Sequence, residues 1–160
     1  MMKIKNISQL VYSIVICQLA GIIGSFFTFP SIQTWYAALE KPSFNPPNWL
    51  FSPVWITLFI LMGVSLYLVW SSGAKTRYVK IALTLFGIQL ILNILWSIIF
   101  FGLKSPFYAF IEIAILWVAI LLTIFKFFKI SKTAAYLLIP YLLWVSFAAV
   151  LNFSIWVLNS

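Results

Sequence analysis

The chain has 160 residues, of which 64% are hydrophobic and only 8% are charged. A water-soluble domain of this size has too little interior to bury so much apolar surface. The composition therefore excludes a soluble globular domain and predicts a membrane protein. The formal net charge of +8 would also suit a nucleic-acid-binding protein. However, the basic residues stand between the apolar runs and form no single patch, so we expect no nucleic acid among the partners.

Five apolar runs are long enough to cross a bilayer, which requires about 20 residues in a helix. They predict an all-α membrane protein, a bundle of five transmembrane helices that forms a single domain over residues 1–160. The predicted helices cover roughly residues 8–29, 48–70, 78–102, 106–125 and 134–158.

The basic residues predict the orientation of this bundle. Eight of the ten lie before the first run, between the second and third, or between the fourth and fifth. Lys41 and Lys104 lie in the connections at the other side. Basic loops are retained in the cytoplasm, so we expect a cytoplasmic N-terminus and an external C-terminus. The expected location is the plasma membrane of a bacterium, as a multi-pass protein surrounded by membrane lipid. The first run lacks a small-x-small cleavage site, which favours a retained helix over a signal peptide.

The first run carries Ala20, Gly21 and Gly24 at nearly helical spacing. Small residues in this arrangement let another helix approach closely. Packing inside the bundle and a dimer interface both explain them. The pair Phe29-Pro30 is expected to end the helix, because the residue before a proline is pushed out of the α region.

A loop of about residues 30–47 joins the first two predicted helices and is rich in proline and aromatic residues. Each proline fixes a backbone dihedral angle, so we expect a loop of defined shape, acting as a lid. Asn45 is expected to cap the second helix, with Pro46 at its first position. Pro53 is expected to bend the beginning of that helix.

Helical spacing places Phe51, Trp55, Phe59 and Met62 on one face of the second helix. Aromatic stripes of this kind usually serve packing or interfacial anchoring, so packing and ligand contact both remain open. The third helix carries a polar stripe instead. Its members recur at every fourth position and should face the bundle interior, because lipid cannot solvate them. Interhelical hydrogen bonds and ligand contact explain this stripe equally well. It consists of Gln89, Asn93 and Ser97.

The fourth helix contains Glu112, six residues after Pro106 and hence about 9 Å along the axis. We expect a structural hydrogen bond or an ion pair, with Lys104 within reach, in preference to proton chemistry. In the fifth helix, Pro140 should cause a kink. Beyond it, Trp144, Ala148 and Asn152 recur at spacings of four and should form one flat wall, with room beside the indole ring.

Hydrolytic and metal chemistry lack their residues. The chain has no His, one Cys and two acidic residues. Neither a Ser-His-Asp triad nor a zinc site can be assembled from these. We expect no metal site, and Cys17 alone cannot form an internal disulfide.

Three segments together resemble one known family. They read WYAALEKPSFNPPNWLFSPVW at residues 35–55, LNILWSIIFFGLKSP at 92–106 and LLIPYLLWVSFAAVLNFSIWVLN at 137–159. Their sequence and order are similar to those of the tryptophan-rich sensory protein (TspO/MBR) family, which includes the mitochondrial translocator protein, or peripheral-type benzodiazepine receptor. The resemblance implies a five-helix bundle, often a homodimer, in which the first loop closes over a ligand cavity.

The resemblance also implies a function and a set of residues. Members bind porphyrins and haem, and animal members bind sterols and benzodiazepine-type drugs. No cofactor is required, and porphyrin or haem is expected as the ligand. Trp55 and Trp144 match two tryptophans implicated in tetrapyrrole breakdown by some bacterial members, which makes them the catalytic candidates. The ligand-binding positions that follow from the matching motifs are Tyr36, Pro42, Trp55, Asn93, Trp96, Ser97, Trp144, Phe147 and Ala148.

Three functional hypotheses follow. The first is an integral membrane binding protein for tetrapyrroles, with a role in their regulation or transport. The second is an enzyme that degrades porphyrin with light and oxygen, and the third is a sterol or lipid transporter or a stress-sensory regulator. Phe153 and Val157 stand where animal members have a Tyr and an Arg in their sterol-recognition segment. Phe44 occupies a position that is often Trp. The first departure weakens the sterol hypothesis, and the second keeps the aromatic ring but loses the indole hydrogen-bond donor.

Overall fold

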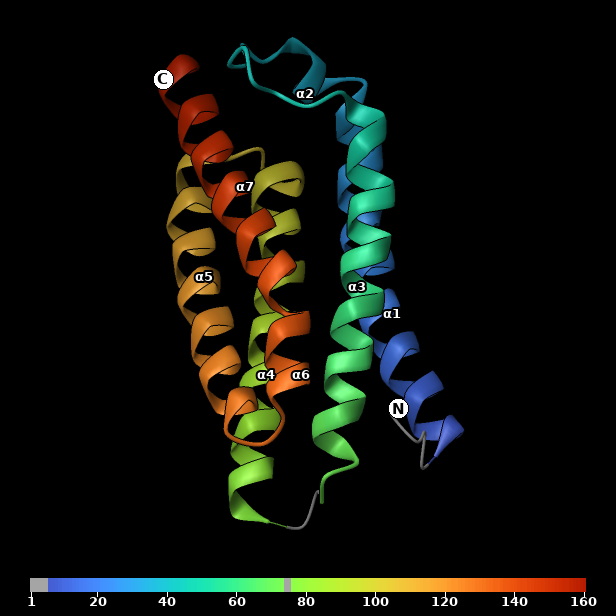
Figure 1. The fold of residues 1–160 in the computed structure, drawn as a ribbon. Helices are drawn as coiled ribbons and strands as arrows, with labels where there is room; N and C mark the ends of the chain where they lie inside the picture. Colours follow the sequence, from blue (N-terminus) through green and yellow to red (C-terminus); the bar gives the residue numbers. More distant parts are fainter. Residues whose placement is uncertain (1–5, 74–75) are drawn as a thin grey trace.

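The computed structural model describes residues 6–73 and 76–160, and within them it contains helices and loops only (Figure 1). Five helical segments are long and apolar enough to cross a membrane, which confirms the predicted fold class. Lys3, Lys5 and Lys75, used above for the orientation, lie outside the described residues. The elements are α1 Ile7–Ile32, α2 Trp35–Ala38, α3 Asn48–Trp70, α4 Arg77–Ser97, the π-helical turn η1 Ile98–Gly102, α5 Pro106–Phe128, α6 Lys132–Leu137 and α7 Ile139–Leu158.

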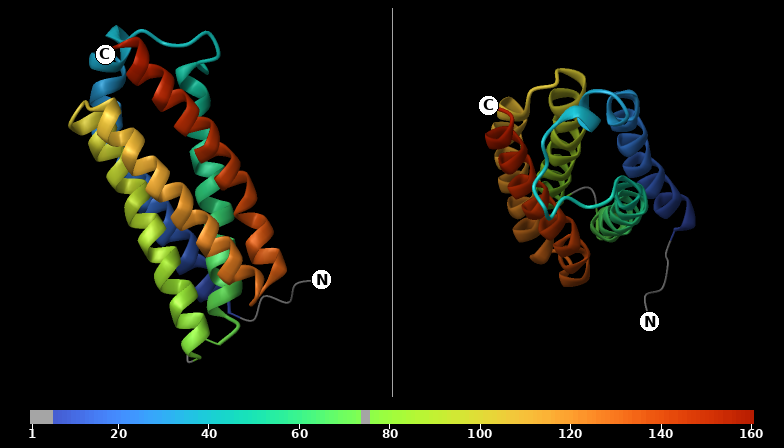
Figure 2. Two further views of the ribbon diagram at one scale, coloured as in Figure 1. Left: turned by 90° about the vertical axis from the view of Figure 1, so that its left-hand side faces the viewer. Right: turned by 90° about the horizontal axis from the view of Figure 1, so that it is seen from above.

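The long helices run antiparallel to their chain neighbours and form one bundle. Helix α1 packs against α3, and α5 packs against both α4 and α7. Stacked rings of Phe86 and Phe127, 5.7 Å apart, hold α4 against α5. Short helix α2 and the loop after it lie across one end of the bundle, where the loop approaches the C-terminal end of α7 (Figures 1 and 2). This end of the bundle is the one that positions the functional site.

Glycines allow α1 to approach its neighbours closely. A Cβ atom added at Gly63 of α3 would lie 2.6 Å from the Cα atom of Ile14. One added at Gly21 would lie 2.5 Å from the ring of Phe59. The small residues of α1 therefore serve packing within the bundle, the first of the two explanations above.

Two predicted helix boundaries are wrong. Helix α1 does not end at Phe29-Pro30 but continues to Ile32. Its last turn is anchored because the Ser31 hydroxyl donates a hydrogen bond to the carbonyl of Phe101 at 2.9 Å. Asn45 does not cap α3 either, since this helix begins at Asn48 and has Pro47 at its N-cap. The Asn45 side chain accepts a hydrogen bond from Tyr36 instead.

The ends of α4 and α6 show one unpredicted and one predicted feature. Helix α4 continues into the π-helical turn η1, where the amide of Leu103 donates to the carbonyl of Ile98 at 2.8 Å. Helical spacing in the sequence gave no sign of this turn. The predicted kink at Pro140 is present as a break at Leu138 between α6 and α7, and Pro140 stands in the first turn of α7.

Candidate ligand-binding site

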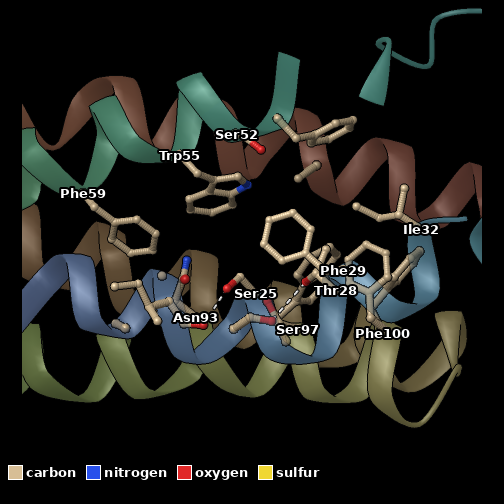
Figure 3. A pocket seen from close by; sticks show the side chains of 18 of the residues that line it. Ser25, Thr28, Phe29, Ile32, Ser52, Trp55, Phe59, Asn93, Ser97 and Phe100 are labelled. Carbon is tan, nitrogen blue, oxygen red and sulfur yellow. Dashed lines mark hydrogen bonds between the residues drawn. The ribbon is translucent and has the colours of Figure 1, made fainter. Parts of the chain in front are cut away.

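A cavity of about 320 Å³ lies between α1, α3, α4, η1 and α7, beneath the α2 loop. Figure 3 shows Trp55 and Phe59 of α3 on one side of it and Ser25 of α1 on the other. Asn93 and Ser97 of α4 lie on the same side as α1 in this view. The lining is largely apolar, with a small number of polar groups, which is the usual composition of a small-molecule site.

Neighbouring aromatic rings hold Trp55 and Trp144, two of the three indoles that line this cavity, in place. The Trp55 ring stacks on Phe59 with centroids 5.4 Å apart and meets the edge of Tyr141 at 6.2 Å. Trp144 meets Phe51 at 6.0 Å. Aromatic pairs at these distances are favourable beyond their buried area. Both indoles therefore present preformed walls to a ligand.

Hydrogen bonds between helices orient the polar lining residues. The Asn93 amide donates to the hydroxyl of Tyr141 at 3.0 Å, which joins α4 to α7. Asn152 accepts a hydrogen bond from the indole nitrogen of Trp96 at 3.1 Å. The same side chain donates to the carbonyl of Pro106 at 2.8 Å. Asn93 and Asn152 thus join helices through hydrogen bonds and also line the cavity.

The loop over the cavity is held in a defined shape, as predicted. The Tyr36 hydroxyl donates to Asn45 at 2.9 Å, and the Lys41 ammonium lies 4.8 Å from the centre of the Tyr36 ring. Burial raises the pKa of Tyr36, and the hydrogen bond to Asn45 offsets part of that increase. The phenol therefore remains a neutral hydrogen-bond donor at physiological pH. Trp35 packs edge-on against Phe100 at 5.6 Å, which fixes α2 to η1.

Seven of the nine predicted ligand-binding residues line this one cavity. The other two, Pro42 and Phe147, do not. The ring centroid of Phe147 lies 5.6 Å from that of Trp144, which does line the cavity. The carbonyl of Pro42 accepts a hydrogen bond from the amide of Asn45 at 3.0 Å and shapes the loop. The seven lining residues are Tyr36, Trp55, Asn93, Trp96, Ser97, Trp144 and Ala148.

Sequence reasoning missed the contribution of α1, which provides one side of the cavity. A signal was present, because the lining positions recur at spacings of three and four, the pattern of one helical face. The lining positions with this spacing are Gln18, Gly21, Ser25, Thr28 and Ile32. Three of these side chains are polar, in an otherwise apolar helix.

Gln89 and Glu112 are buried polar residues that lie outside the cavity lining. Gln89 is 1% exposed and Glu112 is 5% exposed. Gln89 thus faces the interior, as the polar stripe predicts. Among the described residues, however, neither side chain has a hydrogen-bond partner. The expectation that Glu112 makes a structural hydrogen bond or an ion pair is therefore wrong, since no donor from a neighbouring helix reaches its carboxyl group.

Within residues 6–73 and 76–160, no group of three or more His, Cys, Asp or Glu side chains could hold a metal ion. What the cavity offers instead is aromatic surface with a few hydrogen-bonding groups. The fold and the site together define a five-helix integral membrane protein with an internal cavity beneath a folded loop.

Comparisons with known proteins agree with this class. The sequence pattern of the TspO/MBR family matches residues 13–157, and the chain belongs to this family. It is 48% identical over 155 residues to the tryptophan-rich protein TspO of Chlorobaculum tepidum, covering 97% of this chain and 98% of that protein. The human translocator protein is 39% identical over 135 residues, which cover 84% of this chain and 80% of that protein.

Proposed function

We propose that this membrane protein binds a porphyrin or haem-type tetrapyrrole in the cavity beneath the α2 loop. The observation that carries the proposal is that Trp55 of α3 and Trp144 of α7 line the same cavity. Trp55 is held by Phe59 of the same helix, and Trp144 is held by Phe51 of α3 and Phe147 of α7. A flat, apolar ring system matches such walls in shape and chemistry, and each aromatic contact contributes about 0.5–1.5 kcal/mol beyond buried area.

The remaining predicted residues have distinct roles in this proposal. Trp96, Ser97 and Ala148 complete the cavity wall, and Asn93 adds hydrogen-bonding capacity. Tyr36 lines the cavity from α2, and Lys41 lies over the Tyr36 ring outside the cavity lining. Pro42 and Phe147 act through the shape of the loop and the position of Trp144. No resident cofactor is required for this function.

A second function, light- and oxygen-dependent breakdown of the bound porphyrin, has its own supporting observation. Trp55 contacts Tyr141, and the hydroxyl of Tyr141 receives a hydrogen bond from Asn93. Two oxidisable side chains thus adjoin each other: Trp55 lines the cavity, and Tyr141 is buried beside it. In this alternative, Trp55 and Trp144 are the catalytic residues and exchange an electron with the excited ring, and oxygen is the terminal oxidant.

Titration of protoporphyrin into the purified protein, followed by chromatography after illumination in air, tests both functions. The samples are the wild type, Trp55→Phe, Trp144→Phe and detergent without protein. Trp156→Phe is the matched control, because Trp156 does not line the cavity. Binding should persist in both cavity variants with modest loss of affinity. Breakdown that is lost in these two variants alone would establish the enzyme, whereas equal decay in all samples would leave a binding protein. A wild type that does not bind protoporphyrin would overturn the proposal.

The same proposal extends to regulation or transport of the tetrapyrrole by a homodimer in a bacterial plasma membrane. Flux of the ligand across sealed vesicles tests the transport step.

The proposed orientation places the α2 loop outside. In sealed cells without Cys17, a cysteine at exposed Ser43 should react with an impermeant maleimide, and one at exposed Ser72 should not. Labelling of the cysteine at position 72 would show that the orientation is the opposite of the proposed one.

A further inference from the structure

We infer that the ligand reaches the cavity sideways from the lipid, through a slot between α1 and α3, while the loop above stays closed. This inference rests on the proposed function, because it names the route by which the tetrapyrrole arrives. It also narrows the ligand class to amphiphiles that dissolve in the half of the bilayer next to α2.

The slot is bounded by side chains that line the cavity and yet face outwards. Ile22 is 50% exposed, Phe29 is 64% exposed and Ile56 is 53% exposed, although all three border the cavity. A side chain can do both only at the edge of an opening. The two edges have helical spacing and run along facing helices (Figure 3). They consist of Ile22, Ser25 and Phe29 on α1 and of Asn48, Ser52 and Ile56 on α3.

The lower part of α1 is fastened to α3, and this closes the base of the slot. Backbones approach closely where Gly63 faces Ile14. The amide of Gln18 donates a hydrogen bond to the carbonyl of Ile56 at 3.1 Å. The contact of Gly63 with Ile14 lies towards the end of the bundle remote from α2, and the bond from Gln18 to Ile56 marks the lower limit of the opening.

The upper part of α1 is fastened to a different neighbour. A Cβ atom at Gly24 would lie 3.0 Å from the hydroxyl of Ser97, and one at Gly102 would lie 3.1 Å from the ring of Phe27. Ser31 adds its hydrogen bond to η1. Helix α1 thus packs against α3 in the half remote from α2, and against α4 and η1 in the half next to α2. This change of partner along its length leaves the slot between α1 and α3.

Hydroxyl groups near the slot bond within their own helix. The Ser25 hydroxyl donates to the carbonyl of Ile22 at 2.6 Å, and that of Thr28 donates to the carbonyl of Gly24 at 3.1 Å. A ligand that passes them breaks no hydrogen bond between α1 and α3. The edges belong to membrane-spanning segments, so an apolar ring can move from hydrocarbon into the cavity without crossing water.

The loop offers a more costly route. The backbone amide and carbonyl of Glu40 are both hydrogen-bonded to the Asn159 side chain, at 3.0 and 2.9 Å. Tyr36 and Asn45 hold the loop a second time. Opening it therefore disrupts several hydrogen bonds, whereas the slot is already open.

Binding kinetics distinguish the two routes. The protein is placed in lipid nanodiscs, and the association and dissociation rates of protoporphyrin are measured for the wild type, Ser52→Trp and Ile22→Trp, which narrow the slot from either side. Thr57→Trp is the control, because Thr57 is exposed on α3 but does not line the cavity. Asn159→Ala loosens the loop. We expect both slot variants to slow association by a factor of about ten or more, because a narrower passage raises the barrier to entry. Thr57→Trp and Asn159→Ala should leave the rates unchanged.

A readout without tetrapyrrole separates this inference from the proposed function. Ala148 lies on the cavity wall contributed by α7. In a Cys17→Ala background, Ala148→Cys should react with lipid-soluble pyrene maleimide, and Ser52→Trp should slow the reaction by a similar factor. Faster labelling in Asn159→Ala, with no effect of Ser52→Trp or Ile22→Trp, would overturn the sideways route. A wild type that shows sideways labelling but binds no protoporphyrin would overturn the proposed ligand and leave the route standing.

Discussion

The Asn159 side chain forms two hydrogen bonds with the backbone of Glu40, although the two residues are 119 positions apart. It accepts from the Glu40 amide at 3.0 Å and donates to the Glu40 carbonyl at 2.9 Å. The same side chain donates to the carbonyl of Ile155 at 2.8 Å, within α7. The last turn of the fifth spanning segment thereby fastens the loop that closes the cavity.

Removal of this fastening should loosen the loop alone. In Asn159→Ala, we expect faster hydrogen exchange over residues 39–47, corresponding to about 0.5–1.5 kcal/mol for each bond lost. Exchange in α3 and α5 should not change. Hydrogen-exchange mass spectrometry measures both, and Ser160→Ala is the neighbouring control. Unaltered exchange in the loop would show that other contacts hold it.

The hydroxyl of Tyr36 should hold the loop up to high pH. Its pKa is raised above the ordinary value of 10.0, chiefly by burial. A raised pKa means that the closed loop retains the proton longer than the open loop does. The closed form is thus fully favoured below pH 10, and this advantage is lost as pH rises towards the raised pKa. The difference in phenolate absorbance between wild type and Tyr36→Phe should titrate above pH 10. Titration below pH 10 would contradict a buried phenol.

Two glycines should respond oppositely to alanine. Gly63→Ala places a methyl group against the backbone of Ile14, which cannot move aside easily. We expect it to destabilise the protein by about 1–3 kcal/mol. Gly87 has open space at the same position, so Gly87→Ala should stabilise its helix by up to about 1 kcal/mol. Unfolding in detergent measures both, and equal effects would show that the contact between α1 and α3 is not tight.

Replacement of buried polar groups that lack partners should be tolerated. Gln89 and Glu112 have buried side-chain atoms without hydrogen-bond partners among the described residues. An unpaired buried polar group costs about 1–3 kcal/mol, so Gln89→Leu and Glu112→Leu should preserve or raise thermal stability. Asn93→Leu is the contrasting variant, because it removes the donor to Tyr141 and should destabilise. A large loss in Glu112→Leu would indicate that the carboxyl group has a partner.

The metal of a haem should contribute little to its affinity. Proteins hold haem iron through His, Cys, Met or Tyr. The residues that line the cavity include Tyr36 from this set, and its hydroxyl is engaged with Asn45. Met62 is buried in α3 and does not border the cavity. We therefore expect protoporphyrin and haem to bind comparably. A visible spectrum of low-spin haem with two axial ligands would refute this.

Much of this architecture could be predicted from the sequence because membrane helices are determined locally. A run of about 20 apolar residues has only its own backbone for hydrogen bonds in lipid, so it must be helical wherever its neighbours lie. The same local rule places Gln89 and Asn93 towards the interior, because a bilayer cannot solvate an amide. Spacings of four along α3 and α7 also identified the faces that carry Trp55 and Trp144.

Only the tertiary structure decided which faces meet and what lies between them. Whether α1 leans on α3 or on α4 depends on contacts between residues far apart in the chain, such as Gly63 with Ile14 and Ser31 with Phe101. No local preference encodes these pairings. The helical end at Pro30 was mispredicted because the long-range hydrogen bond from Ser31 to Phe101 outweighed the local signal. The role of Asn45 was mispredicted because its side chain bonds to Tyr36 within the folded loop. The cavity exists because α1 changes partners along its length, and that is a property of the packed bundle.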